Sequence, residues 1–281
     1  MTDEDPRHPL AARWTWLSSR GLDSGLFDQE SVCYTWCRTL RQKVGVLGAE
    51  NFRLIGCQTV IYTPGLNFRT TTISGHLMSG WADRFNGEPL LIPTMEDAPP
   101  SVPRLVLKSS DSKYRLQAGP TRLDLFWEAT SDTDVLDTGS HLQFSTEVIR
   151  HYLEVTRASV GRLAAVLKRI ATNDAPAMTL ARHFCRDRWL AGPLNRPSDF
   201  QLHARKCFDL PNSFRVNSWF RCKTAQVGKE RAPAILVEQD FNTLAEELES
   251  RDYGPEQIGA FFSPTLIAEF DRVLELYFPK E

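Results

Sequence analysis

The chain has 281 residues, of which 42% are hydrophobic and 24% are charged, and its formal net charge is −2. This is ordinary globular composition, which argues against a disordered chain, and the length suffices for one large domain or two small ones. The nearly balanced charge gives no general attraction to nucleic acid or anionic lipid, so any such attraction has to come from a local patch.

The distribution of cysteines and the lack of recognisable targeting and catalytic motifs limit the classes of protein that this chain can belong to. Six cysteines are scattered through a chain that can build a core without disulfides. We find no positively charged leader and no apolar run long enough to span a bilayer. A glycine-rich phosphate loop, a serine nucleophile elbow and paired zinc ligands are also missing. The sequence therefore predicts a cytoplasmic protein with free thiols, no catalytic residues, no cofactor and no membrane partner.

Residues 1–48 are predicted to form an N-terminal helical extension. Asp28 is a suitable N-cap for a helix that runs to about Val44 with one apolar stripe. Cys33 and Cys37 share a face of this helix. A zinc pair there has no second pair to complete it, so buried packing is the favoured interpretation.

The first half of the core, 49–158, reads as strand, helix, strands, helix. Residues 52–62 are rich in β-branched and aromatic side chains, and residues 70–85 have helical spacing. Residues 104–128 alternate apolar and polar positions, with turns at 109–112 and 119–120, which is typical of consecutive antiparallel strands. An acidic loop at 130–140 precedes a helix that is predicted to open at Ser145 or Thr146.

The second half, 159–281, repeats that order. A strand is predicted at 161–170, a helix at 178–190, strands at 200–208, 214–223 and 234–240, and helical segments at 244–248 and 258–277, with Pro264 starting a new helix. The sequence thus predicts an α+β fold with an antiparallel sheet covered by helices and an internally duplicated strand–helix–strands–helix unit.

Segment 102–129 carries the one resemblance to a known family. A proline-led strand is followed by a polar turn, a strand with a Leu-Gln pair, a Pro-x-Arg-Leu turn and a strand ending in Phe-Trp. The matching positions are Pro103, Leu105, Ser110, Asp111, Leu116, Gln117, Pro120, Arg122, Leu123, Phe126 and Trp127. This pattern resembles the signature region of a sporadically distributed family of uncharacterised bacterial proteins. The resemblance implies an α+β fold, a bacterial origin and a link to defence or mobile genes, but no activity.

The hairpin 199–224 carries the best candidate for a binding site. Strand alternation places its apolar residues on one face and gathers basic, aromatic and amide side chains on the other. The predicted binding residues are His203, Arg205, Arg215, Asn217, Trp219, Arg221 and Lys223. Arginines beside an exposed tryptophan suit phosphates with a stacked base, or an acidic protein. The alternative is a solvated face whose arginine stems cover the tryptophan, with carboxylates such as Asp124 and Glu128 neutralising the charge.

Two further candidates have simpler explanations. His183 and Asp187 lie one helical turn apart in a basic segment, but a surface salt-bridge network is the favoured account of that segment. Asp199, Asp209, Glu238 and Asp240 would form a metal-nuclease site only if they converged with a lysine, and no such spacing is present.

The resulting hypothesis is a non-catalytic bacterial binding or interaction protein, a component of a multi-gene defence or mobile-element system. Its partner would be a protein or a nucleic acid bound by the basic–aromatic face. One alternative is a nuclease or other hydrolase in phage defence. Another is a structural subunit of a homo-oligomer, with its aromatic residues buried in the interface; these are Trp14, Trp16, Trp36, Phe261, Phe262 and Phe278.

Overall fold

A computed structural model describes residues 47–65, 68–93, 98–210, 214–228 and 230–280. The predicted N-terminal helix, Cys33, Cys37 and the three N-terminal tryptophans lie outside the described residues. None of the described helices is long and apolar enough to cross a membrane.

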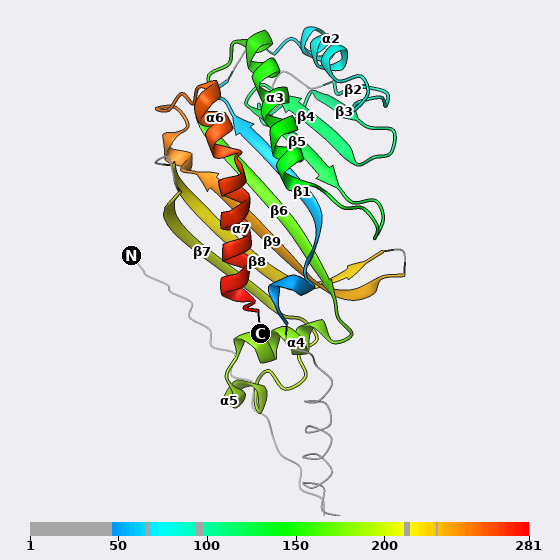
Figure 1. Ribbon diagram of the computed structural model, residues 1–281, viewed down its shortest axis with the longest axis vertical. Coiled ribbons are helices and arrows are strands. Elements are labelled where there is room, and N and C mark those ends of the chain that lie inside the picture. Colours follow the sequence, from blue (N-terminus) through cyan, green and yellow to red (C-terminus); the bar gives the residue numbers. More distant parts are fainter. Residues whose placement is uncertain (1–46, 66–67, 94–97, 211–213, 229, 281) are drawn as a thin grey trace, which may run out of the picture. The chain divides into compact units, whose positions relative to one another are not determined.

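Nine strands form one sheet in which every neighbouring pair is antiparallel. The strands are β1 (Arg53–Tyr62), β2 (Leu90–Leu91), β3 (Leu105–Lys108), β4 (Tyr114–Gly119), β5 (Arg122–Glu128), β6 (Arg162–Thr172), β7 (Gln201–Leu210), β8 (Phe214–Val227) and β9 (Ala232–Thr243). The helices are α2 (Thr70–Gly80), α3 (Thr138–Thr156), α4 (Pro176–Phe184), α5 (Asp187–Leu190), α6 (Pro255–Phe261) and α7 (Pro264–Tyr277), with short 3₁₀ turns η1 (Ala49–Asn51) and η3 (Ala245–Glu247). This arrangement confirms the predicted α+β class with an antiparallel sheet (Figure 1).

The strand order is β2-β3-β4-β5-β1-β6-β9-β8-β7, and apart from the two-residue edge strand β2 it is symmetric about the central pair. β1 and β6 pair with each other; outward from them lie β5 and β9, then β4 and β8, then β3 and β7. The order of elements is also similar on the two sides, since β1-α2-β3-β4-β5-α3 corresponds to β6-α4-β7-β8-β9-α6, whereas β2, α5 and α7 have no counterpart. The two sides of similar element order meet at β1 and β6.

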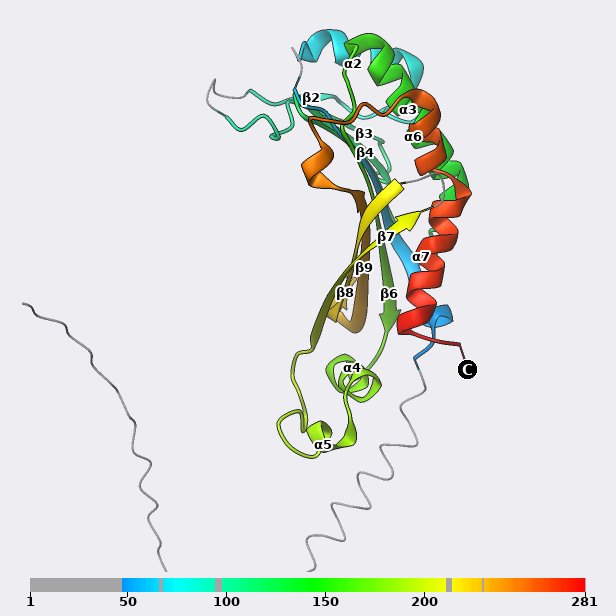
Figure 2. The same cartoon turned by 90° about the vertical axis from the view of Figure 1, so that its left-hand side faces the viewer.

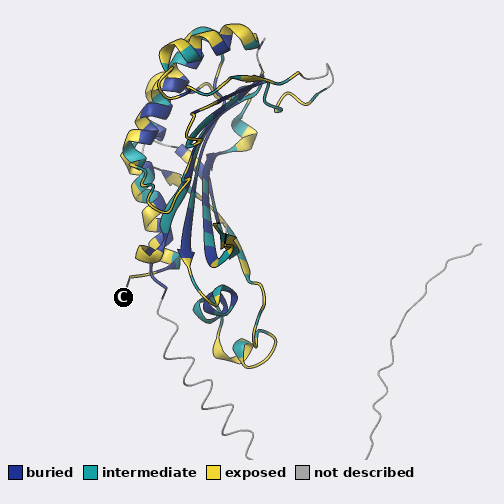
Figure 3. Cartoon of the chain, turned by 90° about the vertical axis from the view of Figure 1, so that its right-hand side faces the viewer, coloured by how far each residue is buried: buried dark blue, intermediate teal, exposed yellow. Residues whose placement is uncertain are grey.

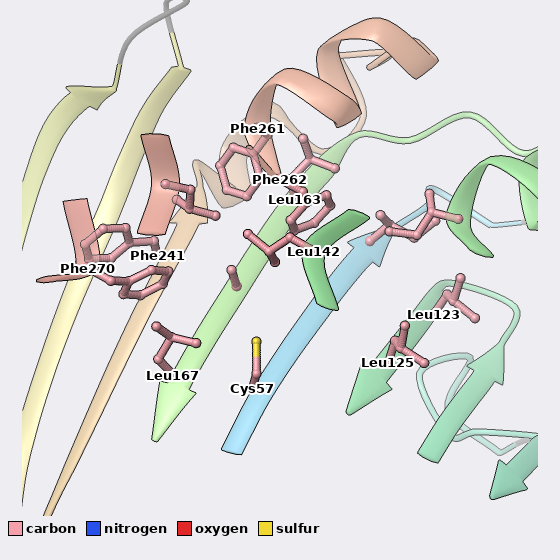
Figure 4. Close-up of a cluster of buried hydrophobic side chains, with 14 of the residues drawn as sticks. Cys57, Leu123, Leu125, Leu142, Leu163, Leu167, Phe241, Phe261, Phe262 and Phe270 are labelled. Atoms are coloured by element: carbon pink, nitrogen blue, oxygen red, sulfur yellow. The ribbon is translucent and has the colours of Figure 1, made fainter. Parts of the chain in front are cut away.

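Helices α3, α6 and α7 lie together on one face of the sheet, which we call the helix face (Figure 2). The main hydrophobic core lies between these helices and the sheet, where the burial colouring is darkest (Figure 3). Cys57, Leu163 and Leu167 point from β1 and β6 into this core (Figure 4). The Phe241 ring of β9 stacks on Phe270 of α7 with ring centroids 4.1 Å apart.

Several predicted boundaries are wrong. Helix α3 begins at Thr138 rather than at Ser145 or Thr146, because Asp137 at the end of the acidic loop caps it and accepts the amide hydrogens of Gly139 and Ser140. The helix predicted to reach residue 85 ends at Gly80. The helix predicted over 178–190 is divided into α4 and α5, because Cys185 and Arg186 have extended backbones.

The C-terminal aromatic residues belong to the chain's own core. Phe261, Phe262 and Phe278 are 1%, 3% and 0% exposed. This corrects the expectation that they would be buried in an oligomer interface. The buried thiols are equally inaccessible: burial raises the pKa of both Cys57 and Cys222 to about 12.

Candidate functional site

The second face of the sheet carries no described α-helix over its central strands (Figure 2), and we call it the open face. Alternate residues of each strand point to it, beginning with Gln58, Val60 and Tyr62 of β1. One row of residues crosses it from β4 to β7, one residue per strand: Arg115, Phe126, Gln58, Val166, Asp240, Trp219 and Arg205. With about 4.8 Å between strands, this row is about 29 Å long.

The seven predicted binding residues all lie on the open face. In the pairing of β7 with β8, Arg205 lies opposite Trp219 and His203 opposite Arg221. Asn217, Arg215 and Lys223 follow on the same face by alternation, opposite Cys207, Asp209 and Gln201. The hairpin therefore places on one face the residues that the sequence predicts to share it, whereas the binding role of these residues stays a prediction.

Two guanidinium groups lie close to the Trp219 ring. The centre of the Arg205 guanidinium is 5.4 Å from its ring centroid, and that of Arg221 is 5.2 Å away. Arg205 is also held by the side chain of Asn217, whose Oδ1 accepts hydrogen bonds from Nε at 3.1 Å and Nη2 at 2.7 Å. The neighbours of the Trp219 ring are therefore cationic side chains rather than an apolar cluster.

The basic charge near Trp219 is partly neutralised, but not by the carboxylates that the sequence suggested. Arg221 Nη1 lies 2.6 Å from Glu238 Oε1 and 3.8 Å from Asp240 Oδ2. Asp124 instead pairs with Arg122, and Glu128 with Arg115, in the other half of the sheet. The neutralising residues come from β9, which lies beside β8 although the sequence alone did not predict that neighbour.

Three cations of the predicted set are exposed and make no ion pair within 4.0 Å with any residue that the structure describes: Arg205, Arg215 and Lys223. Arg215 and Lys223 lie on either side of Trp219 along the β8 face. An anionic chain that follows β8 would meet a cation on either side of the ring.

A second aromatic ring on the open face has the same surroundings. Tyr62 lies under the guanidinium groups of Arg122 and Arg162, whose centres are 5.0 and 4.9 Å from its ring centroid. Burial raises the pKa of the Tyr62 hydroxyl, so it stays protonated at neutral pH. A third ring, Phe126, has the Arg115 guanidinium 4.3 Å from its centroid.

A hollow of about 290 Å³ lies beside Tyr62, over the four central strands where the two halves meet. Val60 and Ala164, which are small and nearly inaccessible at 1% and 3% exposure, form its floor. Longer side chains stand around them: Gln58, Tyr62, Arg122, Arg162, Lys168, Glu238, Asp240 and Asn242. Burial raises the pKa of the Asp240 carboxyl, while its hydrogen bond from Asn242 and the charge of Arg221 act in the opposite direction.

The remaining candidates have structural roles. His183 Nε2 lies 2.6 Å from the carbonyl oxygen of Tyr277, and its ring packs against Phe184 and Phe278. Asp199 accepts hydrogen bonds from Gln201 and Thr224. Within the described ranges, no group of three or more histidine, cysteine or acidic side chains is placed to hold a metal ion.

The sequence missed Tyr62, Arg122 and Arg162 as parts of one site. Their spacing in the chain gives no local signal, because they come from three strands that are 60 and 40 residues apart in sequence. The alternation of each strand does predict which of its residues share a face. It does not predict which strands become neighbours.

Comparison with protein-family models finds no match to this chain, and comparison with curated proteins finds no significantly similar sequence. The resemblance of segment 102–129 therefore stays a prediction.

Proposed function

We propose that this protein binds single-stranded nucleic acid on the open face. The observation that carries the proposal is the environment of Phe126, Tyr62 and Trp219, each of which has at least one arginine guanidinium 4.3–5.4 Å from its ring centroid. Sheet surfaces that combine aromatic rings with cations bind single strands by stacking bases and neutralising phosphates, with little dependence on sequence.

The polarity of the open face favours nucleic acid over a protein partner. A protein interface needs a desolvated centre that is poor in charge and rich in apolar contact. The large apolar side chains that the structure describes as exposed are Leu90, Leu91, Val135, Trp189 and Leu276. None of them lies on the seven strands from β4 to β7 in the sheet order. Charged and amide side chains occupy that centre instead.

The distribution of charge supports the same partner. Arg205, Arg215 and Lys223, which have no acidic partner among the described residues, lie at the β7–β8 margin, where phosphates would run. The carboxylates of Asp124, Glu238 and Asp240 lie toward the centre. Carboxylates in that position would meet base edges, which carry hydrogen-bond donors, rather than the phosphate backbone.

The stacking role of Trp219 is tested by Trp219→Ala. Stacking on an aromatic side chain contributes about 1–3 kcal/mol per base, so we expect the dissociation constant for an oligonucleotide to rise by about 5- to 150-fold. The measurement is fluorescence anisotropy with labelled (dT) and (dC) strands of about ten nucleotides, a length within the usual site size.

Trp189→Ala is the matched control for that experiment. Trp189 is 47% exposed on α5 and also has an arginine beside it, but it is not on the sheet. We expect its replacement to leave affinity unchanged. Equal losses in the two variants, or no binding by the unaltered chain, would refute the stacking model. Capture of a protein that resists nuclease treatment, together with no oligonucleotide binding, would favour the protein-partner alternative.

A charge-reversal pair tests the phosphate contacts. We expect Arg215→Glu/Lys223→Glu to weaken binding and to reduce the slope of log K against log salt by about 1.4, since each phosphate contact to a single strand contributes about 0.7. Arg221 is unsuitable for this test, because its reversal would also break the pair with Glu238. Arg69→Glu/Arg150→Glu changes the same charge at exposed positions of the helical layer. An equal change in slope for this control would point to a non-specific effect of net charge.

A nuclease is the second candidate, and one observation favours it. Asp240 is a partly buried carboxylate with a raised pKa in a hollow, which is an arrangement that active sites often use for acid–base chemistry. The same oligonucleotides, incubated with the protein and separated on a denaturing gel, test this alternative. Cleavage that disappears in Asp240→Ala would replace the binding proposal by an enzymatic one.

A further inference from the structure

Some polar side chains around the hollow beside Tyr62 hydrogen-bond to one another, whereas others have atoms without a partner among the described residues. Arg122 and Asp124 form a two-point pair, with Nε and Nη2 each 2.7 Å from a carboxylate oxygen, and Gln58 Nε2 donates to the same carboxylate at 2.7 Å. Gln58 and Arg122 line one side of the hollow, and their bonds to Asp124 hold both side chains in place. Arg122 Nη1 and Gln58 Oε1 make no hydrogen bond with any residue that the structure describes, so they could still contact a ligand.

Asp240 in the opposite wall keeps a free acceptor. Its Oδ1 accepts a hydrogen bond of 2.8 Å from Asn242 Nδ2. Its Oδ2 is 3.8 Å from Arg221 Nη1, which is beyond hydrogen-bond distance. Among the described residues, no donor lies within hydrogen-bond reach of Oδ2, and a partly buried carboxylate oxygen in that state favours a ligand that donates to it.

Donors stand near this acceptor as well. Arg162 uses Nε on the carbonyl oxygen of Thr243 at 3.1 Å and Nη2 on Asn242 Oδ1, so its Nη1 is not engaged. Lys168 pairs in register with Glu238 on the next strand, but its ammonium group makes no ion pair or hydrogen bond with any residue the structure describes. The hollow thus offers the free acceptor of Asp240, with the Glu238 carboxylate nearby, beside the cationic donors of Arg162 and Lys168.

We propose that the hollow takes one nucleobase that carries an exocyclic amine, with the amine donating to Asp240 and a ring acceptor facing Arg162 or Lys168. This proposal rests on the proposed function and adds a base preference to it. At about 290 Å³ the hollow is at the small end of ligand pockets, which suits a single base rather than a larger molecule. The Tyr62 ring stands at its side as an aromatic surface.

The chemistry favours bases that carry an exocyclic amine over thymine and uracil. Cytosine, adenine and guanine carry an amine next to a ring acceptor or carbonyl, so each can donate to a carboxylate and accept from a cation. Thymine and uracil have a carbonyl oxygen where cytosine has its amine. Their ring donor N3–H is flanked by two carbonyl oxygens, so a carboxylate that accepts from it lies close to two further acceptors, which weakens the contact.

The raised pKa of Asp240 is consistent with a residue kept for binding rather than for stability. A carboxyl whose pKa is raised on folding contributes stability at low pH that is lost as the pH rises through the folded value. At neutral pH the charged form is therefore a cost to the fold. Asp240→Asn should raise the melting temperature at neutral pH, because the amide retains an oxygen for Asn242 and removes the buried charge.

The test compares (dC) with (dT) oligonucleotides of about ten nucleotides at neutral pH, using the full chain. A hydrogen bond to a charged group predicts that (dC) binds about ten- to a hundredfold more tightly than (dT). Asp240→Asn should bring this ratio close to one, because an amide can either accept from an amine or donate to a carbonyl. Asp209→Asn is the control, since Asp209 is an exposed carboxylate of the open face outside the hollow. It should keep the ratio of the unaltered protein.

The outcomes separate this proposal from the one on which it rests. Tight binding of both strands with equal affinity would overturn the base preference and leave the binding function standing. A preference that survives Asp240→Asn would overturn the assignment to the hollow. No binding to either strand would overturn the proposed function and, with it, this inference.

Discussion

Replacing Phe241 by alanine is expected to lower the free energy of unfolding by about 3–5 kcal/mol. Phe241 is fully buried on β9, where its side chain lies between the sheet and α7. Its ring stacks on Phe270 at 4.1 Å and meets Phe208 edge-on at 5.7 Å. The loss combines the transfer of the ring from water, the cavity left behind and the aromatic contacts. Since a domain is stable by only about 5–15 kcal/mol, this single change should shift the urea midpoint strongly.

Two companion variants make that result interpretable. Phe241→Leu keeps most of the volume and should cost distinctly less, so it remains measurable if the alanine variant does not fold. Leu276→Ala removes a side chain that is 66% exposed on α7, and we expect almost no change in the midpoint. A Phe241→Ala variant as stable as Leu276→Ala would contradict the placement of α7 on the sheet.

Acidification from about pH 6.5 to pH 4 is expected to remove about 3 kcal/mol of stability through one buried histidine. His141 in the first turn of α3 is 1% exposed. Burial first, and the charge of Arg84 second, lower the pKa of its imidazole to about 4. In the unfolded chain the ring binds a proton near pH 6.5, whereas in the folded chain it does so only near pH 4. The unfolded state therefore gains a proton first as the pH falls, and stability is lost across that window.

His141→Gln separates this effect from other acid-sensitive groups. Glutamine carries no titrating proton, so its unfolding free energy should be much flatter between pH 6.5 and pH 4 in urea titrations. The pKa values of the neighbouring carboxyls Asp134 and Asp137 are lowered, that of Asp134 by Lys113 and hydrogen bonds from Thr130 and Ser131, and that of Asp137 by hydrogen bonds from Ser140 and Gly139. The stability that these two charged carboxylates contribute is therefore lost mainly below pH 4, outside the range in which His141 acts. The same slope in wild type and His141→Gln would show that His141 is not buried in its neutral form.

These two predictions probe the helix face of the sheet, whereas the binding predictions probe the open face. The two sets should be nearly independent, because the strands alternate and a side chain on one face does not contact residues on the other. Trp219→Ala should change binding with a small effect on stability, and Phe241→Ala the reverse. Asp240→Asn is expected to stabilise the fold while it removes base preference, which is the trade-off seen where a site holds an unfavourable charge.

The sequence by itself determined the local features of this protein. The period-two alternation in 104–128 and 200–223 predicted strands β3–β5 and the β7–β8 hairpin, and it placed His203, Arg205, Trp219 and Arg221 on one face. Adjacent strands joined by a short connection have few registers available, and a slip by one residue would turn every apolar side chain outward. Pro264 was likewise a reliable start of α7, because proline at a first helical position loses no hydrogen bond.

Helix boundaries were less well determined. Ser145 and Thr146 resemble N-cap residues, but their hydroxyls donate to carbonyl oxygens one turn earlier inside α3. The same residue types serve at a cap or within a helix, and only the packing of Leu142 and Phe144 into the core shows which applies here.

Only the tertiary structure decided which strands are neighbours. β1 and β6 pair although 100 residues separate their facing ends Tyr62 and Arg162, and β9 lies between β6 and β8. That arrangement brings Glu238 and Asp240 to Arg221 and assembles the hollow from β5, β1, β6 and β9. The physical reason is that alternation specifies which face of a strand is buried, whereas the choice of partner depends on the packing of the whole helix face. No local sequence pattern predicts which strands become neighbours in the sheet.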